Sequence, residues 1–252
     1  MIRTSIQAQA QYRVDFLLQL FLAFFWTLAS IAPLWLVFEI RPDIGGWSRP
    51  EAMLVMSAFL VLKALIDGII SPNLNALVEQ VRLGTFDFVL LKPADPQLLV
   101  SASRVVVPKL ADLAAGLGLS AWSILQIDPA PSVLQIAAGG IMLLAGALGI
   151  YGVWMLIICT AFWFVKIDNL SFLFTSIFDA ARWPISVFRG WLGFILTFVL
   201  PIAVMTSFPA LAVLGRLSLA RAAFAGATTA FLLFFSRRVW LWALRHYASA
   251  SS

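Results

Sequence analysis

The chain has 252 residues, of which 62% are hydrophobic and only 12% are charged. Soluble globular chains are nearer about 45–50% apolar and about 25% charged, so composition excludes the soluble enzyme folds. The sequence predicts an all-α integral membrane protein. In such a protein the net charge of +5 reflects Lys and Arg at the ends of spans and does not indicate nucleic acid binding.

The N-terminal residues 1–14 are polar but compatible with a helix. Ile2 and Ile6 fall on one helical face, which predicts an amphipathic helix lying at the membrane interface, with a frayed tail as the alternative. The apolar run that follows is too long for the hydrophobic region of a signal peptide. We therefore expect it to be an uncleaved first span.

Apolar segments of membrane-spanning length recur along the chain. We predict a single transmembrane domain, 1–252, with six transmembrane helices. Their expected limits are 16–38, 52–71, 105–127, 133–165, 190–206 and 222–242.

The second predicted span contains Lys63 and Asp67, four residues apart on one helical face. Charges at membrane depth are costly and usually pair or face a cavity. The two residues could form a polar site on a substrate or proton path, or a mutually neutralising pair close to a helix end at Pro72. In the first span Phe24 and Phe25 are further candidates for lining a path; alternatively they face lipid or pack between helices.

A polar loop, 73–103, follows the second span. Leu74, Leu77 and Val81 predict a short amphipathic helix within it that ends at Gly84. Beyond this helix, Pro93 and Pro96 interrupt regular structure, because a residue before proline is disfavoured in the helical region.

The segment 169–189 is apolar but carries charges and Pro184. We expect an interfacial helix that leads into the fifth span, with a start of that span near Leu170 as the competing interpretation. Pro201 and Pro209 indicate a break in the chain near the outer surface. A short re-entrant or interfacial helix over 203–215 is consistent with that break.

Six spans place both termini on one side, and basic residues are concentrated there. The positive-inside rule then predicts that both termini and the 73–103 loop are cytoplasmic. The basic residues assigned to the cytoplasmic side are Arg3, Arg13, Arg82, Lys92, Arg104, Lys109, Lys166, Arg182, Arg189, Arg237, Arg238 and Arg245, against Arg41, Arg49, Arg216 and Arg221 on the other side.

Sequence motifs for catalysis or metal binding are absent. There is no phosphate-binding loop, HExxH, CxxC or GxSxG motif. Cys159 is the single cysteine and His246 the single histidine, so neither a disulfide nor a His/Cys metal site is expected. The chain is predicted not to be an enzyme and to hold no cofactor of its own.

The order of these parts resembles the membrane subunit, or permease, of type-2 ABC exporters, in the small six-span branch without a fused nucleotide-binding domain. Three passages carry the resemblance, which covers nearly the whole chain. They are Arg82-Leu83-Gly84-Thr85-Phe86-Asp87 followed by Leu91-Lys92-Pro93, the segment 178–184 (FDAARWP), and Val199-Leu200-Pro201-Ile202-Ala203 through Phe208-Pro209.

The resemblance implies that separate ABC ATPase subunits, which carry ATP and Mg²⁺, bind this chain from the cytoplasm. It also implies a second permease, identical or different, and a location in the bacterial cytoplasmic membrane. The loop after the second span would act as a coupling helix seated on the ATPase. By position, the residues implied in that contact are Glu79, Arg82, Gly84, Asp87 and Lys92.

Two other functions compete with this interpretation. A secondary transporter would use Lys63 and Asp67 as its ion or proton site, although the inverted repeat typical of that class is not evident. A membrane scaffold subunit without transport activity is the other alternative.

Overall fold

The computed structural model describes residues 13–101, 103–163 and 168–247. The predicted interface helix over residues 1–14 lies almost entirely outside this part of the chain. The longer helices are α2 (Arg13–Ile40), α3 (Arg49–Leu65), α4 (Ser71–Arg82), α7 (Lys109–Gln126), α8 (Val133–Cys159), α9 (Asp168–Phe178) and α13 (Leu219–His246). The shorter elements are α5 (Asp87–Leu90), α6 (Pro96–Ser101), α10 (Gly190–Phe194), α11 (Ile202–Met205), α12 (Ser207–Val213), β1 (Asp43–Ile44) and β2 (Trp47–Ser48).

Four helical stretches in the described residues are long and apolar enough to cross a membrane: Phe21–Ile40, Arg49–Arg82, Val133–Phe162 and Leu219–His246. They correspond to the first, second, fourth and sixth predicted spans. The third predicted span corresponds to α7, whose 18 residues reach about 27 Å at a rise of about 1.5 Å per residue. The fifth has no continuous helix.

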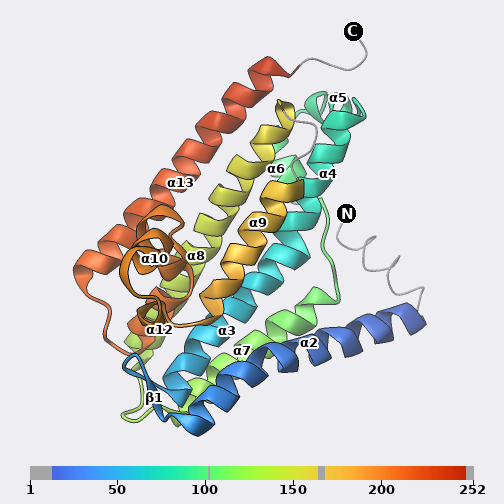
Figure 1. Cartoon of the computed structure of the whole chain (residues 1–252). Helices are drawn as coiled ribbons and strands as arrows, with labels where there is room; N and C mark the ends of the chain where they lie inside the picture. The colour runs from blue at the N-terminus through green and yellow to red at the C-terminus, as the bar shows by residue number, and fades with distance from the viewer. Residues whose placement is uncertain (1–12, 102, 164–167, 248–252) are drawn as a thin grey trace.

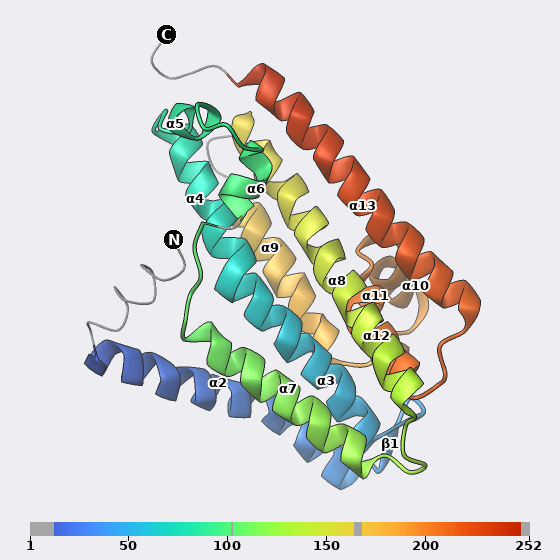
Figure 2. The same ribbon diagram turned by 180° about the vertical axis from the view of Figure 1, so that it is seen from behind.

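The helices form a bundle around α3 and α4 (Figures 1 and 2). The α7 helix packs along α3, α8 packs along α13, and α9 lies beside α8. The α2 helix meets the bundle near the β1–β2 hairpin and diverges from α4 toward its own N-terminal end. This divergence leaves one side of α2 with large exposed apolar side chains, among them Phe21 and Trp26.

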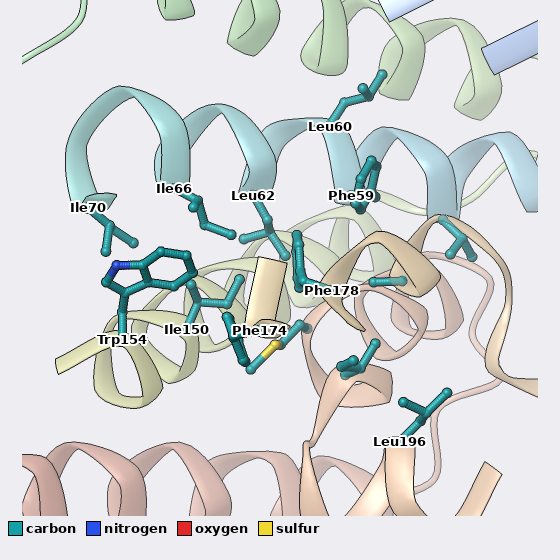
Figure 3. Close-up of a cluster of buried hydrophobic side chains, with 14 of the residues drawn as sticks. Phe59, Leu60, Leu62, Ile66, Ile70, Ile150, Trp154, Phe174, Phe178 and Leu196 are labelled. Atoms are coloured by element: carbon teal, nitrogen blue, oxygen red, sulfur yellow. The ribbon is translucent and has the colours of Figure 1, made fainter. Parts of the chain in front are cut away.

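The hydrophobic core lies where α3, α8 and α9 meet (Figure 3). Phe59 of α3 stacks on Phe178 at the end of α9, with ring centroids 5.4 Å apart. Trp154 of α8 makes an edge contact with Phe174 of α9 at 5.3 Å. All four side chains are buried, so aromatic packing holds one face of α9 against α3 and α8.

The position of α9 corrects the expectation of an interfacial helix over 169–189. The helix begins at Asp168, close to the competing start near Leu170. It runs beside α8 with Phe174 and Phe178 buried against the core, whereas Phe172 and Leu173 are exposed. The predicted span 190–206 is also divided: α10 and a π-helical turn, Ile195–Val199, end at Leu200. Pro201 cannot donate a backbone hydrogen bond, which explains the interruption before α11 and α12.

The hairpin between α2 and α3 turns at Gly45 and Gly46, whose φ angles are 63° and 82°. Glycine adopts these angles without a steric penalty, which is why the Gly-Gly pair forms this turn. Arg49 pairs with Glu39 and Arg216 with Glu51 at this end. Two of the basic residues assigned to the outer side therefore lie at the same end of the bundle.

The helical stretch that begins with α3 does not end near Pro72, contrary to the sequence interpretation. It passes through a π-helical turn, Ile66–Ile70, directly into α4. Pro72 has no N–H to offer to the Gly68 carbonyl, but the N–H of Val106 donates to that oxygen at 2.9 Å. The partner lost to proline is thus replaced from another segment, and the helix continues.

Small residues on α8 allow close contact with neighbouring helices, as glycine often does in membranes. A Cβ at Gly146 would lie 2.9 Å from the backbone of Met205, whereas a Cβ at Gly140 would meet nothing within 4 Å. We predict that Gly146→Ala destabilises the protein by about 1–3 kcal/mol through overpacking. The thermal unfolding midpoint in detergent measures this effect. Gly140→Ala is the control, and an equal fall in both variants would contradict the close contact.

Candidate functional site

The segment 83–101, called the tip segment below, lies at the end of the bundle opposite the hairpin (Figure 1). It begins where α4 stops: Leu83 donates its N–H to the carbonyl of Glu79 at 2.9 Å. Gly84 then adopts a φ of 69°, a left-handed conformation that is characteristic of the residue after a helix. The predicted helix end at Gly84 is confirmed, and the chain turns back there.

Phe86 fixes the tip segment to the ends of two other helices. Its side chain is fully buried among Phe162 after α8, Trp240 in α13 and Tyr247 after α13, with ring centroids 6.1, 6.2 and 5.4 Å away. All three contacts are edge-on, which is a favoured geometry for aromatic rings. The turn after α4 is therefore held to the ends of α8 and α13.

A polar contact fixes the other end of the tip segment to α13. The guanidinium of Arg237 donates to Asp95 at 3.1 Å and to Gln97 at 2.8 Å. The hydrogen bond from Arg237 holds the pKa of Asp95 below its usual value, so the carboxylate stays ionised to a lower pH than that of an unpaired aspartate. Gln97 and Ser101 are also hydrogen-bonded to the hydroxyl of Tyr151 on α8, at 3.0 and 2.8 Å.

The outer surface of the tip segment is partly apolar. Phe88 and Leu91 are 68% and 79% exposed, and Leu83 and Leu98 are also exposed. Lys92 lies exposed among them. An apolar patch with charged neighbours, carried by a segment that is itself fixed to the bundle, is typical of a protein interaction surface.

The residues predicted for ATPase contact occupy this region. Glu79 and Arg82 pair with each other at 2.8 Å on the exposed surface of α4, Gly84 forms the turn, and Asp87 begins α5. Burial, together with the carboxylate of Asp87, raises the pKa of Tyr247. The half-buried Asp87 side chain thus lies close to Tyr247.

Sequence reasoning missed several residues of the tip. The buried anchor Phe86 and the exposed Phe88 are two residues apart, and nothing in their spacing shows which one is buried. The sequence identifies Arg237 only as one of the basic residues of the cytoplasmic side. Its partner Asp95 is 142 residues away in the chain, so no local pattern could have paired them.

Lys63 lies in α3 and Asp67 in the π-helical turn that joins α3 to α4. Both residues are therefore far from an end of the continuous helical stretch. They line a cavity of about 510 Å³ between α2, α3, α7 and the 3-10 turn Asp179–Arg182 that follows α9. Six charged side chains line it: Lys63, Asp67, Lys109, Asp112, Asp179 and Arg182. Phe24 and Phe25 are 63% and 51% exposed and are not among the lining residues, so the structure separates them from Lys63 and Asp67.

Among the described residues, no group of three or more His, Cys, Asp or Glu side chains could hold a metal ion. The architecture is that of a multi-pass helical membrane protein with a fixed tip at one end. Residues 24–251 match the family described as ABC-2 family transporter protein, and the chain belongs to this family. Comparisons with curated proteins and with solved structures gave no significant match.

Proposed function

We propose that this chain is the permease subunit of an ABC exporter and that separate ATPase subunits drive it through the tip segment. The observation that carries the proposal is the exposed apolar patch of Phe88 and Leu91 on a segment fixed to both α8 and α13. Membership in the ABC-2 family supports the permease assignment. In this proposal ATP and Mg²⁺ belong to the partner ATPase.

The geometry supports two routes for motion from the tip into the bundle. The first is α4, which continues into α3 and extends about 18 Å beyond the π-helical turn at about 1.5 Å per residue. The second passes through Phe86 and Arg237 into the ends of α8 and α13. An ATPase that moves the tip would thus displace several helices together, as rigid-body switching requires.

The rest of the arrangement follows from the same proposal. The whole chain forms one transmembrane domain of six spans with the tip and both termini in the cytoplasm of a bacterium. Its long apolar helices face the bilayer and a second permease, which is either another copy or a different chain. Arg49 and Arg216, which the sequence assigns to the outer side, both lie at the hairpin end. Their position supports this orientation.

Affinity purification of the tagged chain from membranes of its own host, with Mg²⁺-dependent ATPase activity measured in the eluate, tests the proposal. We predict that the wild-type chain retains the ATPase. The double variant Phe88→Glu/Leu91→Glu should retain at least about tenfold less, because desolvated apolar anchors dominate interface affinity.

Leu219→Glu is the matched control, because Leu219 is 89% exposed and lies at the start of α13, near the hairpin end. It should retain ATPase activity like the wild type. Normal retention by the Phe88/Leu91 variant would exclude the patch as the docking site. A folded wild-type chain that retains no ATPase would exclude the exporter function itself.

A further inference from the structure

The cavity beside α2 has two chemically different walls. Leu22, Ala23 and Trp26 form the apolar part of its α2 wall, which also includes Thr27 and Ser30. The opposite side carries three basic and three acidic side chains from α3 and the π-helical turn after it, from α7 and from the turn after α9. Leu22 and Trp26 remain 48% and 65% exposed, so the cavity is accessible beside α2. A ligand that fits these walls has an apolar part and a charged part.

The charged groups around Asp67 are too far apart for direct hydrogen bonds. Lys63 lies 3.8 Å from Asp67 and 4.0 Å from Asp179, and Lys109 lies 4.0 Å from Asp67. Direct N–H···O hydrogen bonds are shorter, at about 2.7–3.2 Å. The charged groups thus attract one another without direct hydrogen bonds, and polar atoms of a ligand could join them. By contrast, Lys109 and Asp112 are in direct contact at 2.9 Å.

The balance of charge defines the kind of ligand. The basic and acidic side chains already balance one another, so a ligand with only one charge would draw one set away and leave the other without its partners in a partly desolvated site, which is unfavourable. A zwitterionic group can place its cationic part against Asp67 and Asp179 and its anionic part against Lys63 and Lys109. Both sets of charges are then matched.

The depth of the cluster fits an amphiphile. Lys63 and Asp67 lie about 21–27 Å along the helix from Arg49, at about 1.5 Å per residue. With Arg49 at one membrane face, this is close to the far boundary of a hydrocarbon core about 30 Å thick. A headgroup at the cluster would then lie at the boundary, and its chain could extend into the bilayer along α2.

We propose that this cavity binds the headgroup of a zwitterionic amphiphile, with its chain against the apolar wall of α2. The site lies within one subunit and does not need the permease function, whereas its assignment to a transported amphiphile rests on that proposed function. Two sources supply this chemistry: a membrane lipid such as phosphatidylethanolamine, and a transported single-chain amphiphile of the same headgroup class.

Native mass spectrometry of the purified full chain, with equal amounts of phosphatidylethanolamine and phosphatidylglycerol added, tests the proposal. The wild type should retain the zwitterionic lipid preferentially. Lys63→Met/Asp67→Asn keeps the net charge but removes both groups. It should retain phosphatidylethanolamine about tenfold less, the effect of losing one or two hydrogen bonds to charged groups.

A second variant tests the cavity without removing a charged group, so that a loss of lipid cannot be attributed only to misfolding of the first variant. Ala23→Phe fills the cavity from α2 without changing a charge and should cause the same loss. The matched control is Glu39→Gln/Arg49→Met, which removes the 3.0 Å ion pair at the hairpin end and should leave retention unchanged. Equal retention of the two lipids by the wild type, or unchanged retention in both cavity variants, would overturn the proposal.

A second arm distinguishes the sources. Lysophosphatidylethanolamine is added to the complex with its ATPase, and ATP hydrolysis is measured. Stimulation that is lost in Lys63→Met/Asp67→Asn identifies a transported amphiphile. Retention of the diacyl lipid without stimulation identifies a resident membrane lipid. Both results support the site.

Discussion

Asn73→Leu is expected to lower the stability of the protein by about 3 kcal/mol or more. The Asn73 side chain is buried and joins two segments of the chain. Its amide group donates to the carbonyls of Ile69 and Arg104 at 2.7 and 2.6 Å. Its oxygen accepts from the N–H of Arg104 at 2.6 Å and from the hydroxyl of Ser103 at 2.7 Å.

Leucine has a similar volume but can form none of these bonds, so buried polar groups of the backbone would lose a partner. The loss of stability is measured as the fall in the thermal unfolding midpoint in detergent, which is followed by size-exclusion chromatography after heating. Asn75→Leu is the matched control on the same helix. Its amide makes one exposed contact with Ser71 at 3.2 Å, so its loss should cost less than about 1 kcal/mol.

A midpoint for Asn73→Leu that equals that of Asn75→Leu would contradict this account. Asn73 acts together with the Val106–Gly68 hydrogen bond, because both secure the chain beside the π-helical turn. Without them, the end of α3 would lose its support just where Pro72 removes a backbone donor. We therefore expect α4 and the tip segment to lose their fixed position as the same bonds are lost.

The sequence was sufficient for features that depend on nearby residues. The Gly45–Gly46 turn and the end of α4 before Gly84 follow from the conformational freedom of glycine. The long apolar helices α2, α8 and α13 follow from composition alone. These elements needed no knowledge of what packs against them.

Other features depend on contacts between distant segments. Pro72 predicted a helix end, but Val106 replaces the missing donor and α3 continues. The same continuation placed Lys63 and Asp67 well inside a helix instead of near its end. Asp179 comes close to Lys63 only because α9 packs against α3 and α8. That packing depends on contacts of the aromatic side chains of α9 with Phe59 and Trp154.

Phe86 and Phe88 provide the sharpest test of how the tip segment works. Phe86 is fully buried against α13 and the end of α8, whereas Phe88 is 68% exposed. Phe86→Ala should lower stability by about 3–5 kcal/mol, as for other buried phenylalanines. Phe88→Ala should leave the unfolding midpoint almost unchanged.

For ATPase binding we expect the reverse order, in which Phe88→Ala has the larger effect and Phe86→Ala the smaller. At a temperature where both are folded, Phe86→Ala keeps the exposed patch and should still co-purify with the ATPase, whereas Phe88→Ala should lose most of it. Phe86→Leu, which keeps apolar volume without the ring edges, should be intermediate in stability. If Phe88→Ala proved the more destabilising variant, the assignment of anchor and contact residue would be reversed. If both variants kept the ATPase equally, Phe88 would have no part in docking, and the contact would have to lie elsewhere on the tip.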